Sequence, residues 1–273
     1  MNDIRELEQM AARMRMDCLQ MIHDSNSGHP GGSLSATEIL TVLYFHTLNI
    51  DVDNPKWPDR DRFVLSKGHA APMVFAALAN RGFFSKEEYK GFRQTGGNLQ
   101  GTVSIHNPGG DMTVGSLGQY LSVAIGMAIA GRLDNKDYKV YAMLGDGELQ
   151  EGQVWEALMF APAMQLGNLV AILDNNHVQM CGKTDDILSL GDLSRKFEAF
   201  GWAVKRIDGH DIAQIMSALD SIPFSLTGQP TMIIADTVKG KGVSYMEGTA
   251  QWHGGAPDDE QLAQAFRELG GAL

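Results

Sequence analysis

An acidic residue and an amide residue, each following a predicted strand, are the side chains best suited to chemistry. Asp146 lies in the sequence Gly-Asp-Gly-Glu at 145–148, directly after the apolar run 138–144, and Asn176 follows the run 168–174. Two apolar runs joined by one helical segment are typical of a βαβ unit, whose parallel strands end at the same edge of a sheet. We therefore expect the oxygens of Asp146 and Asn176 to share one small space.

Those oxygens suit a hard divalent cation. A carboxylate, an amide oxygen and a backbone carbonyl such as that of Val178 would fill half of an octahedral shell, leaving positions for diphosphate oxygens and water. Gly147 leaves room for a phosphate group, and the helical segment that begins at Gln150 adds N–H groups and a positive dipole end. Each motif alone is also typical of an ordinary turn, but the pair at this spacing favours a metal–diphosphate site.

Other phosphate motifs fit poorly. The sequence has no Gly-x4-Gly-Lys-Ser/Thr, and Gln150 stands where a dinucleotide fingerprint needs its third glycine. This excludes a P-loop and an ordinary nicotinamide site.

Half of the histidines lie in glycine-rich or turn segments. Histidine donates hydrogen bonds to phosphate or sugar oxygens and moves protons near neutral pH, so several of them in one pocket would suit carbonyl and hydroxyl chemistry. For each one alone, a structural role is equally common. The four candidates are His29, His69, His106 and His253. We assign the other four to structure: His23, His46, His177 and His210.

The elements that must position these residues follow from the apolar periodicity. The first half is expected to be helical, over 4–22, from a capping box at 35–38 through Tyr44, over 70–81 and over 117–133. The second half alternates strands with helices, with strands at 138–144, 168–174, 202–208 and 231–238 and a closing helix at 257–269. This pattern predicts a single α/β domain over 1–273, with a parallel sheet flanked by helices on both faces. The aperiodic stretch 96–115 is expected to line a site.

Composition excludes several classes of protein. The 273 residues carry a net charge of −11, from 22 Lys and Arg against 33 Asp and Glu, which argues against a nucleic-acid surface. No run approaches 18 apolar residues, and the charged N-terminus lacks the apolar core of a signal peptide. Cys18 and Cys181 are expected to be free thiols. We therefore expect a cytoplasmic protein that binds neither membranes nor nucleic acids.

Five motifs in order carry a family resemblance. They are Ser-Gly-His-Pro-Gly at 27–31, Ser-Lys-Gly-His at 66–69, Gly-Ser-Leu-Gly-Gln at 115–119, the segment 145–152, and Asn176. Together they resemble the thiamine diphosphate-binding half of transketolase, over about residues 10 to 260. The resemblance implies a thiamin diphosphate-binding fold and the transfer of a two-carbon glycolaldehyde unit from a ketose phosphate to an aldose or aldose phosphate.

The resemblance also implies roles for individual residues. It implies that Asp146, Asn176 and the carbonyl of Val178 bind Mg2+ or Ca2+. It implies that thiamine diphosphate is bound by His69, Gly115, Leu117, Gly147, Glu151, Asn176 and His253. It places His29, His106 and His253 around the donor sugar. The sequence departs from the family at 105–108, which reads Ile-His-Asn-Pro where transketolases typically have Gly-His-Pro-Glu, and at 115–118, which reads Gly-Ser-Leu-Gly in place of Gly-Pro-Leu-Gly.

A transketolase-like chain ordinarily continues into a pyrimidine-binding domain and a third domain, whereas this sequence ends soon after His253. The resemblance therefore implies a split enzyme. Its second chain would carry both domains and supply the glutamate that activates the aminopyrimidine ring, together with basic residues for the acceptor phosphate. Twofold pairing would make an α2β2 heterotetramer.

Two other functions remain open from the sequence. The alpha component of a 2-oxo acid dehydrogenase shares the metal motif and the split-chain organisation, but the motifs around His29 and His69 count against it. A non-catalytic diphosphate-binding subunit is the second, and the intact 145–152 segment and the four loop histidines count against that. The sequence does not name the sugar pair, which could involve ordinary or branched pentose phosphates or a secondary-metabolite precursor.

Overall fold

The fold is built on one parallel sheet. The computed structural model describes residues 1–270 and contains a five-stranded sheet in the order β1-β2-β3-β7-β6. Each neighbouring pair of strands in it is parallel. The strands are β1 (Arg62–Leu65), β2 (Val140–Gly145), β3 (Leu169–Asn175), β6 (Ala203–Asp208) and β7 (Thr231–Asp236). A separate antiparallel hairpin joins β4 (Val178–Gln179) and β5 (Gly182–Lys183).

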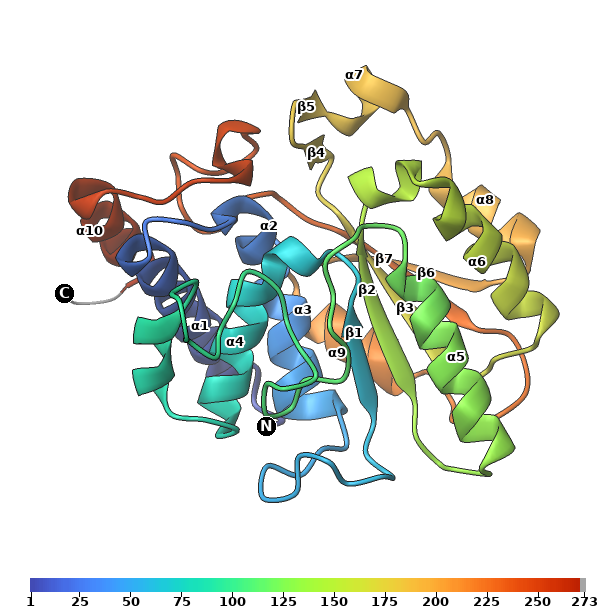
Figure 1. Ribbon diagram of the computed structural model, residues 1–273. Coiled ribbons are helices and arrows are strands. Elements are labelled where there is room, and N and C mark those ends of the chain that lie inside the picture. The colour runs from blue at the N-terminus through green and yellow to red at the C-terminus, as the bar shows by residue number, and fades with distance from the viewer. Residues whose placement is uncertain (271–273) are drawn as a thin grey trace.

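Helices cover both faces of the sheet (Figure 1). Alternate residues of the strands point into two apolar cores, which explains why all seven residues of the central strand β3 are buried. Helices that supply one core are α1 (Ile4–Asp24), α2 (Pro30–Leu34), α3 (Thr37–Val42), α4 (Ala71–Arg81), α9 (Ile212–Asp220) and α10 (Asp259–Glu268). Helices that supply the other are α5 (Tyr120–Leu133), α6 (Gly152–Ala163) and α8 (Leu193–Phe200). The predicted α/β fold, with its parallel sheet and two helical layers, is confirmed.

Short helical segments occupy the connections. They are the π-helical turn η1 (Leu43–Thr47), the 3-10 turns η2 (Gly68–Ala70), η3 (Lys86–Gly91), η4 (Gly147–Gln150) and η5 (Gln251–His253), and α7 (Thr184–Leu188). Among residues 1–270, no helix is both long and apolar enough to cross a membrane.

Two expectations about the first half are wrong. That half is not all helical, because β1 pairs in parallel with β2. Periodicity missed β1 because it has only four residues. The capping box at Ser35 is also absent: α3 begins at Thr37 without a side-chain cap, and the Ser35 hydroxyl donates instead to Asp174 Oδ2 at 2.6 Å. Ser35 therefore belongs to the framework of the candidate site.

The aperiodic stretch runs from the helical layer back to the end of β1. Val114 N donates to the Val103 carbonyl at 3.0 Å, which closes a loop between them. Val114 then packs against Gly68, where a Cβ atom would lie 3.1 Å from Val114 Cγ2. The loop thus places Gly115 at the edge of the sheet where the strands end.

Candidate functional site

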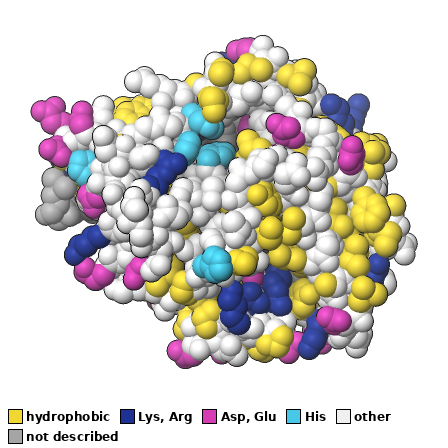
Figure 2. All heavy atoms as spheres, in the orientation of Figure 1, with side chains coloured by type: hydrophobic (Ala, Val, Ile, Leu, Met, Phe, Trp, Pro, Cys, Tyr) yellow, Lys and Arg dark blue, Asp and Glu magenta, His cyan; other side chains and the backbone are white. Residues whose placement is uncertain are grey.

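A cavity of about 240 Å3 opens where β1, β2 and β3 end. The register pairs Gly145 with Asp174 and Asn175 with Asp236, so that the loops after β2, β3 and β7 begin at one level. Eight residues with predicted roles line the cavity: His69, Leu117, Asp146, Gly147, Glu151, Asn176, Val178 and His253. Figure 2 shows histidine side chains gathered beside a hollow on this face.

Asp146 is held by the two loops that follow β2 and β3. Its Oδ1 accepts from Gly147 N at 2.7 Å, and its Oδ2 accepts from His177 N at 2.5 Å and from Thr184 Oγ1 at 3.3 Å. Burial, and after it the nearby Asp174 carboxylate, raise the pKa of Asp146. A cation at this carboxylate would offset both effects.

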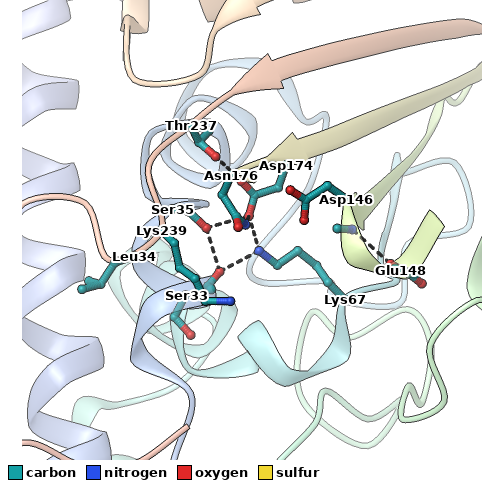
Figure 3. A network of polar contacts seen from close by, with 12 residues as sticks. Ser33, Leu34, Ser35, Lys67, Asp146, Glu148, Asp174, Asn176, Thr237 and Lys239 are labelled. Carbon is teal, nitrogen blue, oxygen red and sulfur yellow. Dashed lines mark hydrogen bonds and ion pairs between the residues drawn. The ribbon is translucent and has the colours of Figure 1, made fainter. Parts of the chain in front are cut away.

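The amide of Asn176 lies between a carboxylate and a backbone N–H. Asn176 Nδ2 donates to Asp174 Oδ2 at 3.2 Å, and its Oδ1 accepts from Val178 N at 3.1 Å. Figure 3 shows Asn176 beside Asp174, with Asp146 on the neighbouring strand end. The oxygen atoms expected to bind the cation therefore lie together at one edge of the sheet.

These donors fit a hard cation such as Mg2+ or Ca2+. Carboxylate, amide and carbonyl oxygens are the ligands that such ions prefer. Within residues 1–270, no group of three His, Cys, Asp or Glu side chains is arranged to hold a metal ion. A cation here would therefore depend on the amide and carbonyl oxygens, and on oxygens of the ligand it accompanies.

Two buried ammonium groups border the cavity, and sequence reasoning assigned neither. Lys67 is 1% exposed and pairs with Asp174, while its Nζ donates to the Gly32 carbonyl at 2.7 Å. Lys239 is 2% exposed, and its Nζ donates to the Val178 carbonyl at 2.8 Å. Burial and then the Lys67 charge lower the pKa of Lys239 to about 8. The available signal was their position, since each follows a strand end and adjoins a glycine.

The structure brings three of the four candidate histidines together. The ring centroids of His29, His69 and His253 lie 5.5, 5.6 and 5.1 Å apart. Burial and then Lys239 lower the pKa of His253 to about 4, and burial and then Lys67 hold the pKa of His69 well below its usual value. Burial, followed by two nearby cations, also lowers the pKa of His29. All three rings are therefore neutral near pH 7, and each can donate one hydrogen bond and accept another.

His106 does not join this group. It is exposed, on a loop whose Ile105 carbonyl accepts from Lys56 Nζ at 3.0 Å. Tight turns hold this loop, because Asn107 Oδ1 accepts from Ser104 N at 2.7 Å and Gly110 N donates to the Asn107 carbonyl at 2.8 Å. These contacts fix His106 beside the segment that precedes β1 rather than at the carboxyl ends of the strands.

Glu148 joins three loops of the site and was also missed. The carboxylate is buried, and its Oε1 accepts from Ser66 Oγ at 2.5 Å and from Gly118 N at 2.9 Å. Its Oε2 accepts from Gly145 N at 3.1 Å. Burial raises the pKa of Glu148. One side chain thus ties the ends of β1 and β2 to the 115–119 segment.

The remaining histidines have contacts that suit structural roles. His23 contacts the Pro257 carbonyl at 2.9 Å, and His210 Nδ1 contacts Glu38 Oε2 at 2.9 Å. His46 Nε2 contacts Asp220 Oδ1 at 3.0 Å. His177 has a φ of 62°, and its backbone N–H serves Asp146.

Known proteins are similar to this chain over nearly its whole length. Residues 7–272 match the family model described as "Transketolase, thiamine diphosphate binding domain". The chain is 40% identical over 266 residues to one of the subunits of the apulose-4-phosphate transketolase of Phocaeicola vulgatus, a match that covers 97% of this chain and 94% of that protein. It is 43% identical over 265 residues to 6-deoxy-6-sulfo-D-fructose transketolase subunit SqwG of Clostridium sp., covering 97% and 96%.

A solved structure agrees with these relatives. Transketolase from Campylobacter jejuni superposes with a TM-score of 0.92 at 33% identity, over 98% of this chain but only 43% of that longer chain.

Proposed function

The chain belongs to the transketolase family through its thiamine diphosphate-binding domain, and from this we propose that it is the diphosphate-binding subunit of a two-chain transketolase. The reaction is the transfer of a two-carbon glycolaldehyde unit from a ketose phosphate to an aldose or aldose phosphate. The observation that carries the proposal is the cavity lined by Asp146, Asn176, two buried lysines, His69 and His253, with the ring of His29 beside both histidines. The family match over residues 7–272 favours this function over the alpha component of a 2-oxo acid dehydrogenase.

In this proposal the cavity holds thiamine diphosphate with Mg2+ or Ca2+. Asp146, Asn176 and the Val178 carbonyl bind the cation, the carbonyl through the lone pair that the hydrogen bond from Lys239 Nζ leaves free. The ammonium groups of Lys67 and Lys239 border the diphosphate. Gly147, Gly115 and His69 border the diphosphate, while Leu117 and Glu151 stand at the cavity wall. Thiamine diphosphate supplies the thiazolium carbon that accepts the two-carbon unit, and the cation neutralises its diphosphate.

The histidines act on the donor sugar. His253 Nδ1 lies 2.9 Å from Lys239 Nζ, and an ammonium group can only donate, so Nδ1 accepts and the ring proton is on Nε2. His253 Nε2 therefore donates to a ketose oxygen. His29, 5.6 Å away by ring centroid, holds a second sugar oxygen and moves a proton to or from it. His106 has no part in this arrangement, because its loop lies elsewhere.

A second chain completes the site. Relatives of nearly the same length as this chain are named as transketolase subunits, whereas the Campylobacter transketolase that matches 98% of it is more than twice as long. We propose that the partner carries the pyrimidine-binding and C-terminal domains and that two copies of each chain form an α2β2 assembly. Exposed apolar side chains support a partner surface, and Figure 2 shows hydrophobic atoms gathered over the α5 and α6 side. Leu133 on α5 and Met159 and Phe160 on α6 are 78%, 52% and 48% exposed, and Met180, which lines the cavity, is 66% exposed.

The donor class follows from the chemistry that the names of two relatives share. One is named for apulose-4-phosphate and the other for 6-deoxy-6-sulfo-D-fructose, so both names describe a sugar with an anionic terminal group. We propose an anionic ketose or ketose phosphate as the donor for this chain.

The test is reconstitution with the candidate partner chain. Thiamine diphosphate, Mg2+, a ketose phosphate and an aldose are added to each chain alone and to the mixture, and the elongated sugar is measured. We expect product only from the mixture. Decarboxylation of a 2-oxo acid without sugar transfer would support the dehydrogenase alternative, and coenzyme uptake without any turnover would support a non-catalytic role.

A further inference from the structure

A fully buried carboxylate lies behind the candidate cation site. Asp174 is 0% exposed, at the carboxyl end of β3 and two residues before Asn176. Its Oδ2 accepts from Ser35 Oγ at 2.6 Å and from Asn176 Nδ2 at 3.2 Å, and it also accepts from Lys67 Nζ. Its Oδ1 accepts from Thr237 Oγ1. Figure 3 shows these donors converging on one side chain.

The donors come from segments far apart in the sequence. Ser35 follows α2, Lys67 follows β1 and Thr237 follows β7. Asp174 therefore connects three segments that meet at this edge of the sheet. All of these contacts run in one direction, because Ser35, Lys67 and Asn176 donate to Oδ2 and Thr237 donates to Oδ1. Both oxygens of Asp174 therefore act as hydrogen-bond acceptors.

This acceptor determines which way the Asn176 amide points. The amide stands between the Asp174 carboxylate, which needs a donor, and Val178 N, which needs an acceptor. Only one of the two amide orientations satisfies both neighbours. The reverse orientation would turn the amide oxygen toward a carboxylate and its NH2 group toward an N–H, leaving buried groups unpaired. The oxygen is therefore held on the side of Val178, and it keeps a second lone pair for a cation in the cavity.

We propose that Asp174 is a positioning residue that fixes the amide oxygen of Asn176 toward the cavity, where it binds the divalent cation that accompanies the coenzyme. This inference rests on the proposed function. It assigns a purpose to the buried Lys67–Asp174 pair, because the ammonium holds the carboxylate in place without displacing the amide.

The test measures the binding of Mn2+ to the assembled two-chain enzyme in the presence of thiamine diphosphate, by the electron paramagnetic resonance signal of free Mn2+. In the Asp174→Leu variant, the side chain at 174 offers no acceptor, so it no longer selects one orientation of Asn176. We expect the Mn2+ affinity to fall about 10- to 100-fold, the usual effect of removing a group that orients a metal ligand.

Matched variants separate orientation from general damage to the network. Ser35→Ala and Thr237→Val each remove one donor to Asp174 but leave the contact with Asn176, so they should bind Mn2+ nearly as the wild type does. Losses in Ser35→Ala and Thr237→Val equal to that of Asp174→Leu would overturn the inference.

A second comparison leaves Asp174 in place, so that the test survives if Asp174→Leu does not fold. Asn176→Asp introduces a charged oxygen ligand but removes the donor to Asp174, and we expect weaker Mn2+ binding than in the wild type. Binding at or above the wild-type affinity would overturn the inference. Absence of Mn2+ binding by the wild type with thiamine diphosphate would instead refute the proposed function itself.

Discussion

Charge balance at the level of single residues explains how the cavity accepts an anionic ligand. Two buried carboxylates, Asp146 and Asp174, face two buried ammonium groups, Lys67 and Lys239. A cation and a diphosphate that enter together add little net charge, whereas the cation alone or the diphosphate alone would add a charge that nothing in the cavity balances. We therefore expect the cation and the coenzyme to strengthen each other's binding, which is a reciprocal linkage.

Lys239 is the residue through which this balance is most easily tested. Lys239→Met removes a charge that faces the diphosphate, so the affinity for thiamine diphosphate in the presence of Mg2+ should fall about tenfold or more, which corresponds to about 1.4 kcal/mol. Isothermal titration calorimetry of the assembled enzyme measures this. Lys241→Met is the matched control, since its side chain is 39% exposed. Equal affinities for the two variants would contradict the role of Lys239.

The histidines make stability depend on pH. The pKa of His253 is about 4 in the folded chain, against about 6.5 when unfolded, so acidification between these values protonates only the unfolded state. The free energy of unfolding therefore falls as the pH decreases from 6.5 toward 4. Because solvent screens the partly exposed ring, this loss amounts to about 1–2 kcal/mol. Urea unfolding at pH 7 and pH 4.5 should show a smaller acid-induced loss in His253→Gln than in the wild type. An unchanged loss would show that His253 is not held neutral.

At the level of elements, Glu148 holds together the loops that form the cavity wall. In Glu148→Gln, the new NH2 group would face N–H or O–H donors, since the carboxylate accepts from Ser66, Gly118 and Gly145. We expect a loss of about 1–3 kcal/mol in the free energy of unfolding, the cost of unpaired buried donors. Chemical denaturation measures it, with the exposed Glu156→Gln as control. Similar stabilities would mean that the three loops are held by other contacts.

The sequence was sufficient to predict the elements with clear periodicity and the strand ends that meet. Asp146 and Asn176 could be paired in advance because one βαβ crossover fixes where both strands end. β1 could not be found, because four residues are too few to show a period. The position of His106 could not be predicted either. The course of a long loop depends on turns such as the one at Asn107, and the residue types alone do not predict them. Lys67 and Lys239 were missed because burial of an ammonium group depends on partners distant in the sequence.

At the level of the whole molecule, the exposed apolar surface over α5 and α6 makes the clearest prediction about assembly. Phe160→Asp places a charge on the exposed side of α6, and we expect association with the partner chain to weaken about tenfold or more, because burying one such side chain contributes about 1.5–3 kcal/mol. Analytical ultracentrifugation measures this. Phe224→Asp is the control, since Phe224 is 41% exposed but lies near His46 and Asp220, in the layer of helices that covers the other face of the sheet. Equal weakening by both variants would argue against a partner surface at α6.

Calorimetry of the assembled two-chain enzyme with thiamine diphosphate shows whether a cation anchors the coenzyme. It is run with Mg2+ present and with Mg2+ removed by a chelator, for the wild type and for Asp146→Ala. We expect saturable uptake of one coenzyme per copy of this chain in the wild type with Mg2+, and a large loss of affinity on chelation or in Asp146→Ala. Uptake that is independent of Mg2+ and unchanged in Asp146→Ala would contradict the claim that oxygens after β2 and β3 hold a cation that anchors the coenzyme.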